Sequence, residues 1–318
     1  MKLHLDKTAF EALLLTIAEQ TNIRADVIEK DYYVTLLLKE LADMQKDLPA
    51  YFKGGTALYK ALGGIRRFSE DIDLTVSIDG CTNNQAKKRL EKAATNYASL
   101  LRNREDADND NRKGSITCIY KYASVVDVDV NDSLQRFGRV KIEATSFTVS
   151  EPVAPITISP IIFDKATDEQ KKILLSDYDV EPFEIQTIKL ERIFVDKIFA
   201  AEFYYLRKSY FDVAKHLYDI AVLLQDKRIK ALLTDNVMLN QMIGYKRREE
   251  GLRKGSDLAK KAIMDFSYLH GVTSNKEFIR EFRRMQEIYV FDSKEIISVS
   301  ELAMAIEKLN AVAELDKI

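Results

Sequence analysis

Two carboxylates stand two residues apart in a stretch that alternates apolar and polar side chains. This alternation over residues 71–78 predicts a strand with Asp71 and Asp73 on its polar face. Side chains so spaced lie roughly 6 to 7 Å apart, so the two carboxylates repel each other and suit a shared divalent cation. Magnesium sites for phosphates use one or two carboxylates together with substrate oxygens. The pair therefore predicts metal-assisted chemistry on a polyphosphate.

A glycine pair precedes these carboxylates. The short run 51–53 reads as a strand that turns at Gly54 and Gly55 into a helix over residues 56–62. Glycines between a strand and a helix expose backbone N–H groups to an anion, and Thr56 adds a hydroxyl. Either motif alone is weak, because most Gly-Gly pairs are only turns. Their order and spacing together predict a nucleotide cradle opposite a metal site.

The elements that position these motifs alternate between helix and strand. Apolar residues at helical spacing predict a helical opening from about Asp6 to Met44. Further along, residues 85–102 read as a helix and residues 105–111 as a polar turn. Strands are predicted over 116–130 and 139–149.

Four of the five prolines, between Pro152 and Pro182, mark a change of pattern. The sequence predicts a first domain over residues 1–180, which includes the N-terminal helices, and a helical bundle over residues 181–318. The helices expected in the bundle are 190–207, 210–226, 228–242, 256–269, 274–288 and 298–315.

Composition narrows the classes of function. The 48 Lys and Arg residues nearly balance the 50 Asp and Glu residues, so a nucleic-acid partner would need a local basic patch. Cys81 and Cys118 are too few for a disulfide framework or a zinc site, which fits a reducing cytoplasm. The three histidines lack the spacing of metal ligands. No run of about 18 apolar residues occurs, so no membrane partner is expected.

The motifs resemble those of a known family. The segments 53–58 (KGGTAL) and 67–74 (RFSEDIDL), with an opening segment similar to 28–33 (IEKDYY), resemble the AbiEii/AbiGii nucleotidyltransferase toxins of the polymerase-beta-like superfamily. The resemblance runs from about residue 10 to about residue 226. It implies an α/β (α+β) fold, in which a nucleotidyltransferase lobe with a mixed sheet is followed by an all-helical C-terminal lobe. The active site would lie between the two lobes.

The resemblance also implies functional residues. Lys197, in a segment Asp-Lys-x-x-Ala, should contact nucleotide phosphates, and Asp219, in Leu-Tyr-Asp, should lie beside it as a charge partner or an acceptor. The catalytic residues would be Asp71, Asp73, Lys197 and Asp219. The nucleotide-binding residues would be Gly54, Gly55, Thr56, Arg67, Ser69 and Lys197.

A third carboxylate normally completes such a metal site from a neighbouring strand. Glu143, in the segment VKIEA, matches the family's later strand best and is predicted as a metal ligand with Asp71 and Asp73. Asp127 and Asp129 are rivals, because they also alternate with apolar residues. The single sequence leaves open which strand is the neighbour.

The strongest local basic cluster lies in the second domain. It predicts an RNA-binding site, although internal Glu–Arg pairs in a solvated loop explain the composition equally well. Tyr204, Tyr205 and Tyr210 could stack on bases, but at helical spacing they are more often core or interface residues. The residues of the predicted RNA site are Lys246, Arg247, Arg248, Arg253 and Lys254.

The resemblance implies a function as well. The chain would be a cytoplasmic, Mg²⁺- or Mn²⁺-dependent nucleotidyltransferase, the toxin of a toxin–antitoxin or abortive-infection system in phage defence. It would transfer a nucleoside monophosphate from a nucleoside triphosphate to an acceptor, chiefly the tRNA 3′ end, and so block translation. The antitoxin, a DNA-binding repressor encoded alongside, need not bind it directly. The alternatives are transfer to a protein or small molecule, a nucleotide-binding regulator without turnover, and a plain RNA-binding module.

Overall fold

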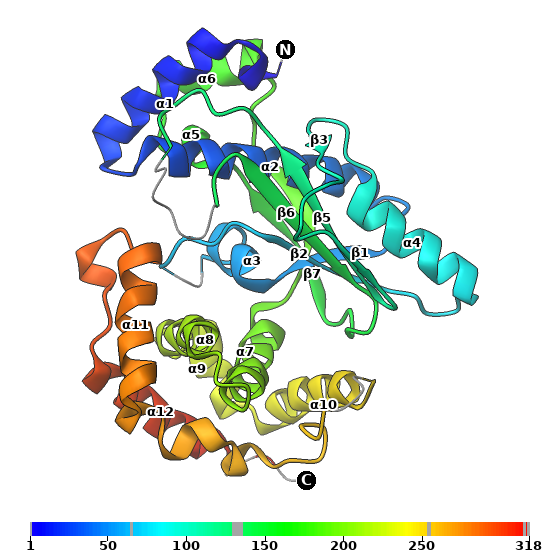
Figure 1. Cartoon of the computed structure of the whole chain (residues 1–318), viewed down its shortest axis with the longest axis vertical. Coiled ribbons are helices and arrows are strands. Elements are labelled where there is room, and N and C mark those ends of the chain that lie inside the picture. Colours follow the sequence, from blue (N-terminus) through cyan, green and yellow to red (C-terminus); the bar gives the residue numbers. More distant parts are fainter. Residues whose placement is uncertain (1, 64–65, 129–135, 253–255, 314–315, 317–318) are drawn as a thin grey trace. The chain divides into compact units, whose positions relative to one another are not determined.

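The chain forms two compact units (Figure 1), and the computed structural model describes residues 2–63, 66–128, 136–252, 256–313 and 316. The first unit comprises Met1–Ala61, Glu70–Ser146 and Ala154–Thr187. The second unit comprises Leu62–Ser69, Phe147–Val153 and Ile188–Ile318. Arg67 and Ser69 therefore belong to the second unit, whereas Asp71 and Asp73, a few residues later in the same motif, belong to the first.

A mixed sheet is the centre of the first unit and has eight strands in the described part of the chain. Its order is β3-β5-β6-β2-β1-β8-β7, and β4 pairs with β5. The pairs β1–β8 and β2–β6 are parallel, whereas β1–β2 and β5–β6 are antiparallel. The strands are β1 (Ala50–Lys53), β2 (Ile72–Val76), β3 (Leu101–Arg102), β4 (Asp110–Arg112), β5 (Ser115–Lys121), β6 (Arg139–Thr145), β7 (Val153–Ile158) and β8 (Phe183–Ile188).

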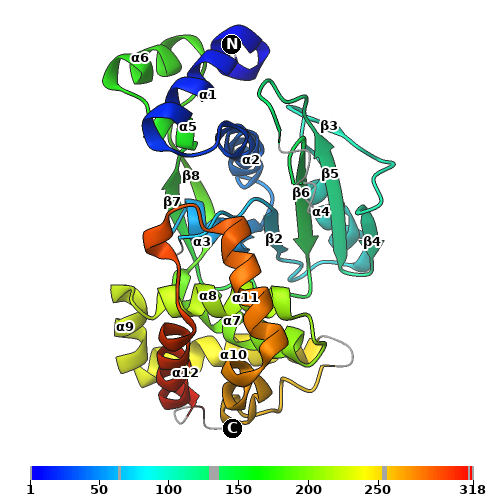
Figure 2. The ribbon, with the colours of Figure 1, turned by 60° about the vertical axis from the view of Figure 1, so that its left-hand side comes forward.

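Helices pack around this sheet. The longest, α2, contacts β6, and α4 packs on β2, β5 and β6 (Figure 2). α4 begins at a capping box, in which the Thr82 and Gln85 side chains satisfy each other's backbone N–H groups. The helices of the unit are α1 (Lys7–Thr21), α2 (Ala25–Met44), α3 (Gly54–Lys60), α4 (Asn83–Thr95), α5 (Ile161–Asp164) and α6 (Asp168–Asp177), with a 3₁₀ turn at Leu3–Leu5.

The second unit is helical. α7 packs against α8, and α8 packs against α11. Its α-helices are α7 (Leu190–Tyr205), α8 (Tyr210–Leu223), α9 (Lys227–Thr234), α10 (Asn236–Leu252), α11 (Lys276–Tyr289) and α12 (Val299–Ala313). Its 3₁₀ turns are Ile263–Asp265, Ser267–His270, Val272–Ser274 and Ser293–Glu295. This mixed sheet and these helices confirm the predicted fold class. Among the described helices, none combines the length and apolar character that a membrane crossing needs.

Several predicted elements have other bounds. The helical opening is two helices, because Asn22 ends α1 in the left-handed conformation with φ 57°. The predicted helix 85–102 ends at Thr95, and the predicted strand 116–130 ends at Lys121. In the second unit, the predicted helix 228–242 is divided between α9 and α10. The predicted helix 256–269 is replaced by two short 3₁₀ turns.

The proline-rich region also contains structure that the sequence analysis did not predict. β7 holds Pro155 within the sheet, which is possible because β7 is the last strand of the sheet order and proline is tolerated on edge strands. Pro160 directly precedes α5, and the capping box of Thr167 and Gln170 starts α6. The region of the prolines is therefore built of strands and helices, with Pro155 inside an edge strand and Pro160 at the start of a helix.

Candidate active site

Asp73 and Glu143 are neighbours across two parallel strands. The register of β2 and β6 pairs Ile72 with Ile142 and Asp73 with Glu143. Ile72 and Ile142 are fully buried, whereas the two carboxylates are only half-buried on the other face of the sheet. The apolar side chains therefore fix the strands in the core, and the same alternation presents both carboxylates together.

The three carboxylates influence one another. Burial, together with the nearby charges of Glu143 and Asp71, raises the pKa of Asp73 to about 7, although Lys53 and Lys141 oppose this shift. Like charges that share a site make ionisation of one of them costly. A divalent cation would relieve this repulsion, so the electrostatics of the site favour a cation.

The backbone of Gly54 lies against Asp73. Gly54 has φ +80°, and a Cβ built on it would approach Asp73 Oδ2 to 2.1 Å. Lys53, the residue before it, is paired with Asp73 in the β1–β2 register. Gly55 and Thr56 follow as buried residues of α3. The sheet thus brings the glycine pair to the carboxylates, and Gly54 gives the Asp73 side chain its space.

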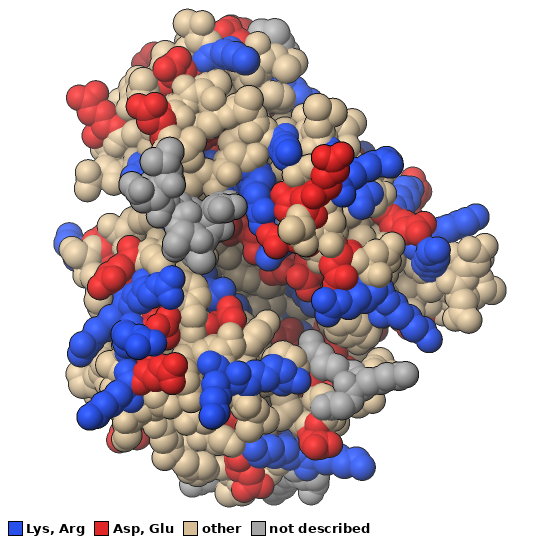
Figure 3. All heavy atoms as spheres, in the orientation of Figure 1, with Lys and Arg blue, Asp and Glu red and all other residues tan. Residues whose placement is uncertain are grey.

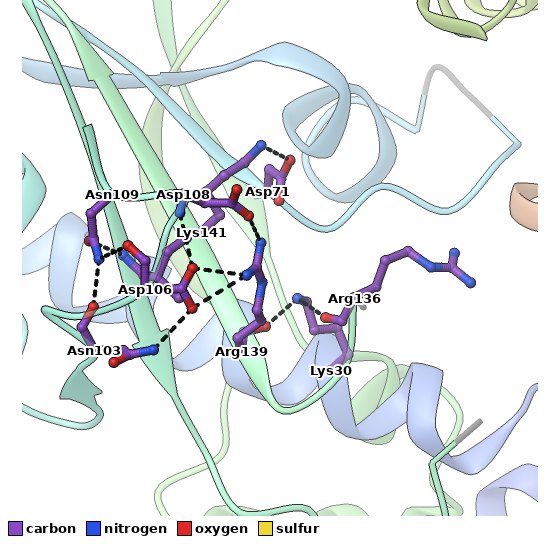
Figure 4. A network of polar contacts seen from close by, with 10 residues as sticks. Lys30, Asp71, Asn103, Asp106, Asp108, Asn109, Arg136, Arg139 and Lys141 are labelled. Carbon is purple, nitrogen blue, oxygen red and sulfur yellow. Dashed lines mark hydrogen bonds and ion pairs between the residues drawn. The ribbon is translucent and has the colours of Figure 1, made fainter. Parts of the chain in front are cut away.

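Asp71, the other carboxylate of the sequence motif, forms an ion pair with Lys141. Lys141 Nζ is 2.7 Å from Asp71 Oδ2, and this pairing raises the pKa of Lys141 although burial opposes the shift (Figure 4). On the same strand, Arg139 binds Asp106 at 3.1 Å and also pairs with Asp108. β6 therefore supplies both a carboxylate and a cation to the site, in register with β2.

Glu143 is the carboxylate that the sheet brings to Asp73. Asp127 lies on an exposed loop beyond the end of β5, not on a strand, and Asp129 lies outside the described residues. The geometry therefore favours Glu143 as the third ligand.

The donor set fits a hard cation that is completed by substrate oxygens. Within the described residues, no three acidic, histidine or cysteine side chains converge closely enough to enclose a metal ion by themselves. Magnesium bound to a nucleotide needs only one or two carboxylates plus phosphate oxygens. Asp73 and Glu143 supply that minimum, with Asp71 beside them.

A buried charge triad lies in the second unit. Asp219 is fully buried, and its carboxylate accepts hydrogen bonds from Arg67 Nε at 2.7 Å and Arg67 NH2 at 2.8 Å. Lys197 Nζ is 2.8 Å from the same carboxylate. Burial would raise the pKa of Asp219, but the two cations more than offset it and lower the pKa to about 2. The predicted pairing of Lys197 with Asp219 is therefore present.

This triad gives Arg67 a different setting from the one expected. Its bidentate bond to Asp219, and a further bond from NH1 to the carbonyl of Phe68 at 3.1 Å, engage the guanidinium inside the unit. Ser69 is half-buried. Arg67 therefore holds Asp219 together with Lys197, and its role in nucleotide binding stays a prediction.

Two of the three described residues of the predicted RNA cluster, Lys246 and Arg247, are engaged in contacts within the unit. Lys246 is buried and pairs with Glu249 at 2.5 Å and with Glu250 at 2.7 Å, which suits a structural ion cluster better than contact with RNA. Arg247 donates to Asp316 and to two carbonyls. Arg248 is exposed above the Tyr245 ring. Arg253 and Lys254 lie outside the described residues.

The charged residues of the segment 28–33 have structural roles that were not predicted from the sequence. Glu29, Lys30 and Asp31 are consecutive, and all three are buried in α2. Glu29 accepts from the Val125 backbone at 2.8 Å, and Lys30 donates to the carbonyls of Arg136, at 2.7 Å, and Arg139 (Figure 4). Each charge therefore fastens a different part of the unit to α2.

Asp31 joins two helices. It pairs with Lys60, the last residue of α3, at 2.5 Å and accepts a hydrogen bond from the Ile161 backbone at 2.6 Å. The helix that starts at the glycine pair is thereby tied to α2 at its far end. Buried charges are rare unless paired, so three consecutive charges within a helical apolar pattern were the signal for this anchoring role.

Comparisons with known proteins identify the family. The family model described as the nucleotidyl transferase AbiEii toxin of a type IV toxin–antitoxin system matches residues 36–290. No curated protein sequence matches the chain. Among solved structures, the chain is similar to MenT4, a nucleotidyltransferase toxin from Mycobacterium tuberculosis H37Rv, at 16% identity and a TM-score of 0.42, over 96% of this chain and 99% of that chain. Since the family model spans well over half of its length, this chain belongs to the AbiEii family of nucleotidyltransferase toxins of type IV toxin–antitoxin systems.

Proposed function

We propose that this toxin transfers a nucleoside monophosphate from a nucleoside triphosphate to the 3′ end of tRNA and so blocks translation. The observation that carries the proposed chemistry is the cross-strand pairing of Asp73 with Glu143 beside the backbone of Gly54. The family supplies the class of reaction, and its toxin–antitoxin context makes a component of translation a fitting target. The proposed place of action is the cytoplasm, where triphosphates, tRNA and the antitoxin encoded alongside occur together.

In the proposed mechanism, Asp73 and Glu143, with Asp71 beside them, hold Mg²⁺ or Mn²⁺. The bound cation would neutralise the triphosphate and polarise its α-phosphate. Gly54, Gly55 and Thr56 form the part of the backbone that faces the triphosphate, because Gly54 lies directly on Asp73. The parallel register of β2 and β6 fixes the carboxylates before substrate arrives, so little reorganisation remains at the moment of reaction.

The bond changes of the proposed reaction are those of an in-line displacement. The acceptor hydroxyl oxygen bonds to the α-phosphorus, the bond from that phosphorus to pyrophosphate breaks, and the hydroxyl proton is released. Lys197 keeps the role of a phosphate contact that the resemblance gives it, and Asp219 keeps the role of its charge partner. Catalysis rests mainly on positioning and charge neutralisation.

Labelled triphosphates test this function. Each of the four, labelled at the α-phosphate, is incubated with the toxin and with separate pools of tRNA, protein and small molecules. Label on tRNA is expected with the wild type, and loss of at least about a hundredfold in rate with Asp73→Ala or Glu143→Gln. Asp127→Asn is the matched control, because it removes a rival carboxylate that lies on an exposed loop.

The alternatives give other results. Label in the protein or small-molecule pool would identify a different acceptor. A nucleotide-binding regulator without turnover would leave the Asp73→Ala variant as harmful as the wild type in a sensitive host. If the wild type and Asp73→Ala stop growth equally and sequencing finds unaltered tRNA 3′ ends, the proposed reaction is wrong.

A further inference from the structure

Cations lie over aromatic rings around the α7–α8 turn of the second unit. At the end of α7, the Arg207 guanidinium is 3.5 Å from the centre of the Phe203 ring, and Arg207 NH1 donates to the Phe203 carbonyl at 2.9 Å. Phe203 is half-buried, whereas Arg207 is exposed. The ring and the carbonyl thus hold a guanidinium plane in a fixed position at the surface.

A second group begins on the other side of the turn. The half-buried ring of Phe211 lies 5.4 Å from Lys215 Nζ and 5.3 Å from the guanidinium of Arg284, so α8 and α11 each place a cation over it. Each cation also has one carboxylate partner, Asp212 for Lys215 at 2.8 Å and Glu281 for Arg284 at 3.2 Å. The side chains of Asp212 and Glu281 are 33% and 14% exposed, so phosphates would compete with these two carboxylates for the cations.

Aromatic contacts connect this second group to the buried triad. Phe211 contacts Tyr289 with ring centres 6.3 Å apart, and the Tyr289 ring lies 5.9 Å from the guanidinium of Arg67. Arg67 in turn holds Asp219, the partner of Lys197. The surface group and the residues that the family resemblance associates with nucleotide are therefore parts of one packed assembly within the unit.

The local charge is positive. Figure 3 shows Lys and Arg side chains gathered over α11 on the face that it displays. In the segments 203–215 and 276–284, cations outnumber the carboxylates Asp212, Glu277 and Glu281. The cations of these segments are Arg207, Lys208, Lys215, Lys276, Arg280, Arg283 and Arg284.

We propose that this cation–aromatic surface, defined by Phe203, Arg207, Phe211, Lys215 and Arg284, binds single-stranded RNA. Surfaces for single strands combine positive charge along the backbone with planar groups for bases, and exposed arginine planes also stack on bases. Arg207 supplies the plane, and Lys215 and Arg284 supply charge for phosphates. This inference rests on the proposed function, for which it names the binding surface of the RNA acceptor.

Binding without turnover tests the surface. A fluorescent single-stranded RNA of about ten nucleotides is titrated with the toxin, in the absence of triphosphate, at several salt concentrations. Arg207→Ala is expected to weaken binding about tenfold through lost stacking. Lys215→Gln and Arg284→Gln are each expected to weaken it several-fold. Lys215→Gln and Arg284→Gln should each also reduce the slope of log affinity against log salt by about 0.7, because each removes one phosphate contact. A residue with a purely structural role would leave this slope unchanged.

Arg228→Gln is the matched control, because Arg228 is also an exposed arginine of the same unit with a carboxylate partner, Asp226 at 2.7 Å. Its RNA affinity should equal that of the wild type. The surface is assigned wrongly if the three surface variants bind RNA as tightly as the wild type, or if Arg228→Gln weakens binding as much as they do. The same conclusion holds if the wild type fails to bind the single strand at low salt, or if a duplex of the same length competes equally well.

Transfer of label, measured separately, distinguishes this proposal from the proposed function. Wild-type protein that binds RNA through these residues but labels another acceptor would refute tRNA as the acceptor and leave the surface intact. Surface variants that keep full RNA affinity while the wild type labels tRNA would refute the surface and leave the function intact. Thermal unfolding of each variant checks that the helices still pack.

Discussion

The Asp73 carboxylate occupies the space that a side chain on Gly54 would need, because a Cβ built there would come within 2.1 Å of Oδ2. The motif glycine is therefore required for two reasons, its φ of +80° and its contact with the carboxylate. One residue of the glycine pair, Gly54, and one residue of the acidic pair, Asp73, are therefore in direct contact. This contact explains why they are informative together and weak apart.

Gly54→Ala should abolish nucleotidyl transfer. The new methyl group would push the Asp73 side chain away from Glu143, and the backbone strain would add about 1 to 3 kcal/mol of destabilisation. Gly80→Ala is the matched control, since Gly80 has φ +69° but no heavy atom within 4 Å of its built Cβ. Equal loss of transfer in both variants would show that strain, not the contact with Asp73, matters.

Metal affinity should depend on pH near neutrality. Burial, with Glu143 and Asp71 beside it, raises the pKa of Asp73 to about 7. Below that pH a proton competes with the metal, so the affinity for Mn²⁺ should rise as pH increases toward 7 and level off above it. Calorimetric titration with Mn²⁺ alone measures this dependence.

Asp73→Asn is the control for the metal titration. It should bind Mn²⁺ more weakly and lose the pH dependence, because the titrating group is gone. An affinity for Mn²⁺ that stays constant from roughly pH 5.5 to 7 in the wild type would contradict the assignment of Asp73 as a ligand.

Asp219 should stabilise the second unit in a pH-dependent way. Its pKa falls from 3.8 to about 2 in the folded chain, so its ionised form is favoured by folding. This contribution, about 2 kcal/mol, is complete above about pH 4 and is lost as pH falls towards 2. At neutral pH, Asp219→Asn should cost roughly 3 to 5 kcal/mol, because two buried cations lose their partner.

Urea unfolding of wild type and Asp219→Asn measures this difference. The gap between their free energies of unfolding should narrow as pH falls from about 4 to 2. A gap that stays constant or widens over this range would show that Asp219 titrates normally in the folded chain.

The buried pair of Asp31 and Lys60 should contribute strongly to stability. Their side chains are 1% and 3% exposed. Lys60→Met should therefore lower the free energy of unfolding by roughly 3 to 5 kcal/mol, because it leaves a buried carboxylate without its cation. The double variant Asp31→Asn/Lys60→Met should cost less than the sum of the single changes.

Lys46→Met is the control for that pair. Lys46 and Asp43 are 3.0 Å apart, but their side chains are 75% and 71% exposed, so the change should stay within about 0.5 kcal/mol. Chemical denaturation measures all these variants. A cost for Lys60→Met as small as that for Lys46→Met would contradict the anchoring role of Asp31.

The features predicted best from the sequence are those that depend on residues close together along the chain. Strand β2 follows from the alternation around Asp71 and Asp73, and the turn at Gly54 follows from the glycine pair. The predicted helices 228–242 and 256–269 were wrong, because the structure has α9 and α10 in place of the first and short 3₁₀ turns in place of the second. In a bundle, tertiary contacts decide where an apolar pattern is interrupted.

In the candidate site, too, tertiary contacts decided what near neighbours in the sequence could not. Glu143 was preferred on the family resemblance, with Asp127 and Asp129 as rivals because they also alternate with apolar residues, and the pairing of β6 with β2 is what brings Glu143 to Asp73. Lys246 appeared basic and available in the sequence, but Glu249 and Glu250 pair with it inside the unit. Charge counted along a chain does not show which charges are already neutralised in space.

By itself, the sequence determined the chemistry of this protein: a carboxylate pair, a glycine turn and the motif order that indicate a nucleotidyltransferase. These features can be recognised in the sequence because their residues lie within a few positions of one another. The tertiary structure alone decided the partners that the sequence did not assign, Arg67 for Asp219 and Lys60 for Asp31, and it placed Glu143 rather than its rivals beside Asp73. Such pairs join distant positions in the chain, and their register is fixed only when the whole sheet and the whole bundle have packed.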